Sequence, residues 1–341
     1  MPKHFYASFD PLLSDADAAE MVDLCHRFGA YKMYSEEPTF AGMLGEGLPA
    51  RFDAVRNFLK TGGRFGRMES IEMLAARTNY FRESYAYGDE IRIAGIEPFL
   101  HHAGFHRAAE ELYGRSIIEP AIVYANLLVP GQELAVHSDV PEFRGANRMR
   151  HPQWLLVAMH HSGLFGHWRM PIATAVAWFH DCAGGEFAFY PEGPAATSIV
   201  HPVRFNTALL LDTDSVFHGV DRVAETGGAI KPMLPGMKLR HTGGDRWHVI
   251  DGERVISEYC WSELRFSISW KAYCFADDAE REAWRNHTDD LDLDRAVRRL
   301  VDDLRERGRI GSQPPGDHEL VELLIDEYIP YPTSEAGRAV S

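Results

Sequence analysis

The chain has few lysines, and it has no long apolar run. Only six of its 35 basic residues are lysine, and the formal net charge at pH 7 is −15. A nucleic-acid backbone or an anionic membrane favours surplus positive charge, so this balance argues against both as main partners. No apolar run reaches the roughly 18 residues that span a bilayer. The first residues also lack the charged-then-apolar order of a signal peptide, so we expect a soluble cytoplasmic protein.

Cysteine is also scarce. The chain has four cysteines, and no two of them have the C-x-x-C spacing of a zinc site or a redox pair. We expect them to be reduced and mostly buried. Repeats, linkers and low-complexity segments are absent too, and a hydrophobic content of 45% is ample for a packed core. One structural domain with helical additions is therefore expected.

The two ends of the chain have helical patterns. Residues 1–116 indicate helices and loops, and residues 276–341 indicate a charged helical extension. Ser14 followed by Asp17 is a capping signal, and Gly29 is a typical helix end. The predicted helices are 14–28, 53–59, 97–113, 293–307 and 318–328.

Residues 117–275 have a different character, with short β-rich runs separated by turns, which predicts a mainly β core of the sandwich or jelly-roll type. An insert at 224–261 carries hairpin signals at Gly243-Gly244 and Asp251-Gly252. We expect it to project as a flap or as an oligomer contact, so a homodimer is possible. The predicted core strands are 122–129, 133–137, 172–179, 186–190, 199–203, 207–211, 216–220 and 265–273.

One predicted strand ends in a pattern that can bind a metal. Residues i and i+2 of a strand share a face, so His137 and Asp139 can converge on one point. They would supply two ligands of a 2-His-1-carboxylate site, which leaves positions on iron(II) open. His218 is the candidate third ligand. It lies 79 residues after Asp139, which leaves room for about four strands between them. A second H-x-D pair, His287 and Asp289, lies in a polar tract and is expected to be a helix start.

Four motifs occur in one order and together resemble the iron(II)- and 2-oxoglutarate-dependent oxygenases, nearest their prolyl-hydroxylase-like branch. They are His137-x-Asp139, the run from Gly184-Gly185 to Pro191, His218-x-Val220, and Arg265-x-Ser267-x-x-Trp270. The resemblance covers residues 117–275 and implies a double-stranded β-helix, iron bound by His137, Asp139 and His218, and Arg265 paired with the distal carboxylate of 2-oxoglutarate.

The chain departs from that pattern in two ways. The arginine follows the distal histidine by 47 residues, where the family has about ten, so the insert must loop out. Arg222 competes with Arg265 for the carboxylate, since it shares the strand parity of His218. A supporting tyrosine is also missing, because Leu128 and Trp178 stand where one is usual. Tyr124 and Asn126 are its possible substitutes in binding the co-substrate.

Substrate contacts are less clear from the pattern. We expect His160, Trp178 and Arg82 to face the substrate, with no catalytic residue beyond the metal site. His160 belongs to a cluster with His161, His167 and Trp168 that is equally consistent with a surface loop. Arg82, with Arg64, Arg67 and Arg77, could bind an acidic substrate or be solvated.

The resemblance implies an enzyme that uses iron(II), 2-oxoglutarate and dioxygen to oxidise an unactivated C–H bond of a small metabolite, such as an amino-acid derivative. Hydroxylation, desaturation and oxidative cyclisation are not distinguished. The alternative is a cupin-like metal-dependent isomerase, or a non-catalytic metal-binding barrel, in which Arg265 would have no anionic co-substrate. We expect the insert to act as a lid over the site, with a subunit contact as the alternative.

Overall fold

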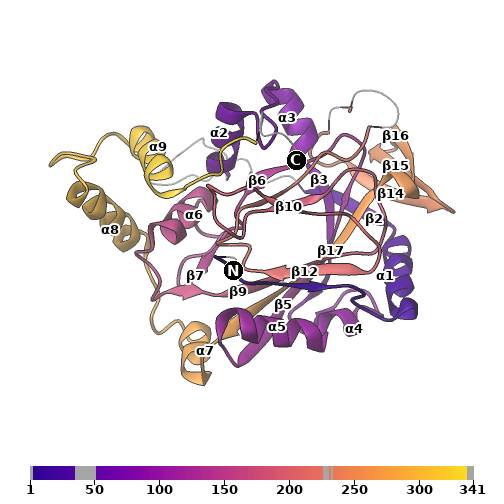
Figure 1. Cartoon of the computed structure of the whole chain (residues 1–341), viewed down its shortest axis with the longest axis horizontal. Coiled ribbons are helices and arrows are strands. Elements are labelled where there is room, and N and C mark those ends of the chain that lie inside the picture. The colour runs from indigo at the N-terminus through magenta and orange to yellow at the C-terminus, as the bar shows by residue number, and fades with distance from the viewer. Residues whose placement is uncertain (1–2, 35–50, 226–229, 232, 336–341) are drawn as a thin grey trace.

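The computed structural model of the 341-residue chain describes residues 3–34, 51–225, 230–231 and 233–335. Two antiparallel β-sheets face each other at its centre, and helices cover the outside (Figure 1). The main sheet contains the order β12-β9-β17-β5, and the facing sheet has the order β11-β10-β13-β6. Successive core strands pass between the two sheets in the order of a jelly roll, or double-stranded β-helix. The predicted fold class is confirmed.

The eight predicted core strands are all present, with ends that differ by a few residues. Side chains alternate between the two faces of each strand, and apolar ones fill the space between the sheets. The strands are β5 (Ile117–Leu128), β6 (Leu134–His137), β9 (Ile172–Trp178), β10 (Phe187–Phe189), β11 (Ile199–His201), β12 (Thr207–Leu211), β13 (His218–Val220) and β17 (Arg265–Phe275).

The N-terminal region is not only helix and loop, as the sequence indicated. It adds strands to both edges of the main sheet: β1 (Tyr6–Phe9) pairs with β12, and β3 (Tyr80–Tyr87) pairs with β5. Beyond β3 lies β2 (Ala30–Tyr34), and the short β4 (Glu90–Ile91) also pairs with β3. The prediction missed these strands because their partners lie far away in the sequence.

The insert extends the main sheet instead of projecting as a flap. Its strands β14 (Lys238–Gly243), β15 (Arg246–Asp251) and β16 (Arg254–Cys260) form two hairpins, at the two predicted turns. β14 pairs with β2, so the hairpins continue the sheet at its far edge (Figure 1). Trp247, Val249 and Met237 are buried against the helices of that face. The prediction that the insert projects as a flap is therefore wrong, because these apolar side chains belong to the core, and the lid role stays a prediction.

Helices cover the main sheet and the far side of the facing sheet. The predicted helix at 14–28 is confirmed as α1 (Asp15–Phe28), where the Ser14 side chain accepts from the Asp17 N–H and Gly29 ends the helix at φ 73°. The helix predicted at 97–113 is broken in two. The remaining helices are α2 (Phe52–Thr61), α3 (Ile71–Thr78), α4 (Glu97–Leu100), α5 (Ala103–Tyr113), α6 (Gln153–Ser162), α7 (Asp278–Arg285), α8 (Leu293–Glu306) and α9 (Asp317–Tyr328), with a 3₁₀ turn at Trp261–Glu263.

The alternation along β17 decides which residues face the site. One face of the strand carries Phe266, Ile268 and Trp270, which point away from the facing sheet and pack in the core under the helices. Arg265 and Ser267 lie on the opposite face, toward the second sheet, where Leu128, Trp178 and Phe187 form an apolar cluster. The space between the sheets is therefore apolar, with a polar row along one strand. No helix in the described ranges is long and apolar enough to cross a bilayer.

Candidate metal centre

Three side chains converge between the two sheets. His137 ends β6, His218 begins β13, and the two residues are paired in register. Oδ1 of Asp139 lies 3.7 Å from Nε2 of each histidine. One nitrogen or oxygen atom from each of the three lies within 4.8 Å of the others, and no other such group occurs among the described residues. The predicted ligand set is brought together as expected.

Backbone carbonyls orient the two imidazoles. Nδ1 of His137 lies 2.7 Å from the carbonyl oxygen of Ala135, and Nδ1 of His218 lies 2.9 Å from that of Val216. A proton on Nδ1 therefore donates to the chain two residues back, and Nε2 keeps its lone pair. Burial lowers the pKa of His137 to about 3 and also lowers that of His218. Both rings are neutral at physiological pH, the form that binds a metal.

Asp139 is held from both ends. Its N–H donates to the Thr213 carbonyl at 2.8 Å, and its Oδ2 accepts from Nζ of Lys271 at 2.6 Å. Burial alone would raise the pKa of Asp139, but Lys271 and the two histidines lower it well below its usual value. The carboxylate is therefore ionised and fixed, with Oδ1 directed at the histidines.

Arg265 lies at the start of β17 and is only 2% exposed. Its Nε donates to the Gly185 carbonyl at 2.6 Å, and Nη1 donates to Oγ of Ser267 at 3.1 Å. A Cβ on Gly185, which has φ 72°, would lie 2.7 Å from Cδ of Arg265. Glycine is thus needed at 185 because Arg265 packs directly on that backbone, and at 184 because a Cβ would meet the carbonyl oxygen of Arg222.

No carboxylate of the described residues pairs with Arg265. Burial lowers the pKa of Arg265 to about 10, so the guanidinium is still charged at neutral pH. Arg222, its competitor, is already paired with Glu133 at 3.0 Å and with Glu69 at 3.3 Å. An anionic ligand would find a free partner in Arg265 and none in Arg222.

A polar row next to Arg265 fits a 2-oxo acid. Ser267 is paired with Asn126 on one side and with Trp178 on the other. Nε1 of Trp178 and Oδ1 of Asn126 are buried and have no hydrogen-bond partner in the described part of the chain. Phe187 connects this row to the metal ligands, with ring centroids 5.8 Å from Trp178 and 5.4 Å from His218. A ligand oxygen, such as a carboxylate or keto oxygen of 2-oxoglutarate, could accept from Nε1 of Trp178, whereas Oδ1 of Asn126 needs a donor.

Tyr124 and Arg82 lie one step further along the same face. Tyr124 is paired with Ser269, two residues after Ser267. The guanidinium carbon of Arg82 lies 3.5 Å from the centroid of the Tyr124 ring. The ring of Tyr124 is therefore covered by Arg82.

His160 does not contact the metal ligands among the described residues. It lies on α6, and its Nε2 lies 2.9 Å from Oγ of Ser215. Its neighbour His161 contacts Ser138, whose side chain points away from the His137 face. His160 and His161 thus lie in a helix that packs with α8 and α9, whereas His167 and Trp168 lie in the turn that follows it, where His167 is exposed. Trp178, also expected to face the substrate, is fully buried, and its ring centroid lies 6.0 Å from the guanidinium carbon of Arg265.

The second H-x-D pair is a structural turn. Asp289 accepts from Nε2 of His167 at 2.8 Å, Nη2 of Arg144 at 2.9 Å and Nε1 of Trp168 at 3.2 Å. The pair was expected to begin a helix, but the next helix starts only at Leu293 and is capped by Asp292. The prediction was wrong in position, because Asp289 ties a loop to the residues after α6.

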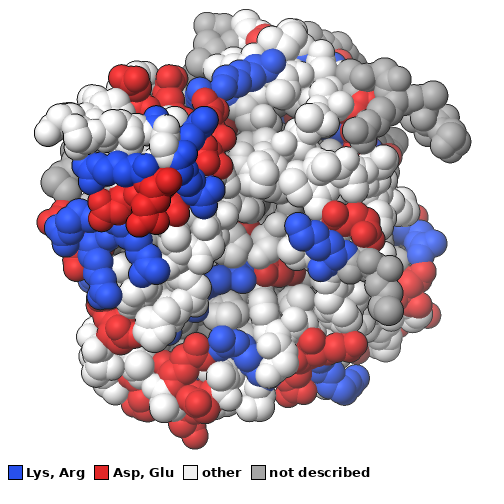
Figure 2. Space-filling view, turned by 60° about the vertical axis from the view of Figure 1, so that its left-hand side comes forward, with Lys and Arg blue, Asp and Glu red and all other residues white. Residues whose placement is uncertain are grey.

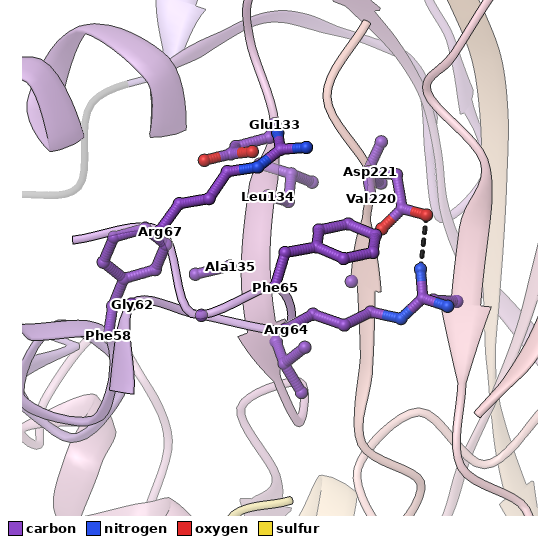
Figure 3. A pocket seen from close by; sticks show the side chains of 14 residues that line it. Phe58, Gly62, Arg64, Phe65, Arg67, Glu133, Leu134, Ala135, Val220 and Asp221 are labelled. Carbon is purple, nitrogen blue, oxygen red and sulfur yellow. Dashed lines mark hydrogen bonds and ion pairs between the residues drawn. The ribbon is translucent and has the colours of Figure 1, made fainter. Parts of the chain in front are cut away.

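A small cavity lies on the other face of the second sheet. It is lined by Ala188, Gly219 and Val136, which alternate with the residues that face the metal site. Figure 3 shows Arg64 paired with Asp221 at one end of it. Its volume of about 20 Å³ holds about one water, so it is too small for a substrate.

The surface in Figure 2 mixes both charge signs. Lys and Arg side chains lie next to Asp and Glu side chains over the described residues of this face, and neither sign forms a broad uniform patch. This agrees with the acidic composition in giving no support for nucleic-acid binding on that face.

No known protein-family model matches the chain. No curated protein matches it either. Solved structures that match include a prolyl-4-hydroxylase from Pseudomonas putida, with 10% identity over 80% of this chain and 94% of that one and a TM-score of 0.40. HygX from Streptomyces hygroscopicus, solved with nickel, 2-oxoglutarate and hygromycin B, has 9% identity over 80% and 84% and a TM-score of 0.40. At such values the function has to be argued from the site itself.

The sequence did not point to Lys271 or Arg148 as site residues. Lys271 lies on the same face of β17 as Arg265, and it is one of only six lysines in the chain. These two facts could have indicated that it faces the site. Arg148 lies in the loop after the H-x-D strand, and its Nη2 donates to the hydroxyl of Tyr34. No local pattern indicates that contact, because the two residues are joined only by the fold.

Proposed function

We propose that the protein is an iron(II)- and 2-oxoglutarate-dependent oxygenase that oxidises an unactivated C–H bond of a small molecule. One observation carries this proposal. A buried guanidinium, Arg265, has no carboxylate partner among the described residues and lies on the inner face of the main sheet, opposite the sheet that carries the three converging metal ligands. A buried charge is costly unless it is paired, so the site requires an anion. The distal carboxylate of 2-oxoglutarate supplies one.

Each residue has a separate task in this reaction. His137, Asp139 and His218 hold the iron, and Lys271 keeps the second carboxylate oxygen of Asp139 occupied. Arg265 binds the distal carboxylate through its planar fork. When bound, iron with 2-oxoglutarate and dioxygen supplies the oxidation: the 2-oxo acid loses CO₂ and becomes succinate with one oxygen atom, and the substrate C–H bond is oxidised with the other.

The apolar lining excludes water from the co-substrate end. Leu128 and Trp178 are fully buried, and Phe187 is 3% exposed. A dry site strengthens the pairing of Arg265 with a carboxylate and limits side reactions. The polar groups in this lining are therefore the ones that must bind the ligand.

The cupin-like alternative uses the same three ligands without a 2-oxo acid. Arg265 argues against it, since a buried cation of that kind has no purpose when no anion enters the barrel. The substrate class in this proposal is a small metabolite, such as an amino-acid derivative. Hydroxylation, desaturation and ring closure all use the same residues.

The test is succinate formation by the full chain with iron(II), 2-oxoglutarate and a panel of amino acids and small carboxylic acids. We expect succinate formation to require iron and dioxygen. Its rate should increase when one group of compounds from the panel is added. Zinc in place of iron is the matched control and should give none. If iron binds but 2-oxoglutarate neither binds nor is consumed, the metal-binding barrel is the better description.

A further inference from the structure

Two arginines from distant parts of the chain meet at one tyrosine. The guanidinium carbon of Arg82, on β3, lies 4.9 Å from the centroid of the Tyr34 ring. Nη2 of Arg148, in the loop after the H-x-D strand, donates to the hydroxyl of the same tyrosine. Tyr34 also packs on Tyr80, with ring centroids 5.2 Å apart. The pair is thus framed by aromatic rings that offer no full negative charge.

Neither arginine has a carboxylate partner among the described residues, whereas Arg64 and Arg77 each have two. Arg64 is paired with Asp221 and Glu335. Arg77 is paired with Glu69 and Glu225. Two like charges held around one ring repel each other, and an anion placed between them would remove that cost. A tyrosine face attracts a cation only weakly in comparison.

Arg82 lies on the face of the main sheet that is turned toward the metal ligands. Arg82 covers the ring of Tyr124, and Tyr124 is paired with Ser269 on β17. Lys271 is two residues further along β17 on the same face, and its Nζ reaches Asp139 at 2.6 Å. Arg82 therefore lies on the inner face of the extended main sheet, the face from which Lys271 reaches Asp139, and Arg148 joins it through Tyr34.

The pair is separate from the co-substrate arginine. Arg265 is enclosed between the sheets at 2% exposure, whereas Arg148 is exposed to solvent. Arg265 is paired in register with Leu128, and Arg82 with Asn126 on the opposite side of β5. A molecule that enters from solvent can reach Arg148 and Arg82 while Arg265 is occupied.

We propose that Arg82 and Arg148 bind an oxyanion of the substrate, a carboxylate or a phosphate, and that the rest of the substrate extends over Tyr124 toward the metal. This inference rests on the proposed function, because it assigns the substrate class of the same site. Planar guanidinium groups match both kinds of oxyanion. The tyrosine rings suit an apolar body next to the anion.

The test uses three probes: benzoate, phenyl phosphate and the neutral benzamide. The full chain is loaded with manganese(II) and saturated with 2-oxoglutarate, so that Arg265 is occupied. Binding is followed by proton NMR of the probe. We expect both anions to bind at least tenfold more tightly than benzamide, and the tighter one identifies carboxylate or phosphate. The para proton should relax faster than the ortho protons, since the anionic end points away from manganese.

Variants assign the effect to the two residues. Arg82→Gln and Arg148→Gln should each weaken anion binding at least tenfold, and Arg150→Gln, at an exposed position in the same loop, should leave it unchanged. Arg148 is on the surface, so its variant should fold, and circular dichroism checks Arg82→Gln. Anions that bind no better than benzamide, or that bind both variants as they bind the parent, would overturn the proposal. If manganese or 2-oxoglutarate fails to bind, the proposed function fails but the anion site does not. Binding of the anions, and its loss in the two variants, is measured without turnover and so tests the anion site by itself.

Discussion

Nζ of Lys271 lies 2.6 Å from Oδ2 of Asp139, while Oδ1 of the same carboxylate lies 3.7 Å from both ligand histidines. One oxygen is thus held by a lysine and the other is presented to the metal. The ammonium also balances the negative charge of the carboxylate before a metal binds. Lys271 is therefore a positioning residue, which acts on the metal through Asp139.

Removing that lysine should destabilise the metal-free protein more than the metal-bound one. The side chains of Lys271 and Asp139 are 18% and 24% exposed, so the pair is mostly buried. Losing one partner of such a pair costs about 3 kcal/mol, at the low end for buried pairs because of this exposure. Lys271→Met should therefore lower Tm, and added metal should recover much of the loss. Thermal unfolding with and without manganese(II) measures this, and Lys238→Met, at an exposed site, is the control. An equal loss in both states would show that Lys271 does not act through Asp139.

Replacing any metal ligand should abolish metal binding without unfolding the protein. His137→Ala, Asp139→Ala and His218→Ala remove atoms that face the space between the sheets, while strand pairing is kept by the backbone. Anaerobic iron(II) titration and succinate formation are the measurements. His287→Ala should behave as the parent, because that histidine is exposed and contacts only Asp290. Tight iron binding by His218→Ala would refute the ligand assignment.

Arg265→Leu should raise the apparent constant for 2-oxoglutarate at least tenfold and change iron affinity much less. A lost hydrogen bond to a charged group costs about 1.5 to 3 kcal/mol, which corresponds to this factor or more. Arg222→Leu should leave that constant unchanged but lower stability, because Glu133 loses its partner while Glu69 keeps Arg77. Titration of 2-oxoglutarate against each variant decides between the two arginines, and the reverse pattern would move the co-substrate site to Arg222.

Gly185→Ala should impair co-substrate binding through Arg265. The new Cβ would lie 2.7 Å from Cδ of Arg265, and the backbone at φ 72° disfavours alanine by about 1 to 2 kcal/mol. We expect lower stability and weaker 2-oxoglutarate binding with near-normal iron affinity. Gly163→Ala, which has φ 73° and open space around its Cβ, isolates the backbone cost from the contact with Arg265. Equal 2-oxoglutarate binding in both variants would mean that the contact with Arg265 does not matter.

The site could be predicted from the sequence where local periodicity determined it. The two-residue repeat of a strand places His137 and Asp139 together, and the parity of β17 places Arg265 inward. Lys271 was missed because its partner is 132 residues away and nothing near it indicates a charge pair. Arg148 and Tyr34 were missed for the same reason, since their contact depends on how the loop after β6 folds over β2.

The insert was placed wrongly because its apolar residues fit two different roles. Trp247, Val249 and Met237 would suit a lid as well as a core, and composition does not distinguish them. What decides is the pairing of β14 with β2, a contact between residues about 200 apart in the chain, which places the alternating side chains against α1. Pairing of that range is not encoded in any short pattern.

Trp247→Ala should therefore destabilise the protein and leave catalytic coupling intact. The ring is fully buried, with centroids 5.9 Å from those of His26 and Trp261 and 6.0 Å from that of Tyr31. Removing a buried tryptophan costs about 3 to 5 kcal/mol. Chemical denaturation measures the loss, and the ratio of succinate to oxidised substrate, taken below the unfolding transition, measures coupling. Val255→Ala, at a side chain that is 43% exposed in the same hairpin, should change stability by less than about 0.5 kcal/mol. A Trp247→Ala protein of normal stability that makes succinate without oxidising substrate would favour the lid role, because a core side chain cannot be removed at no cost.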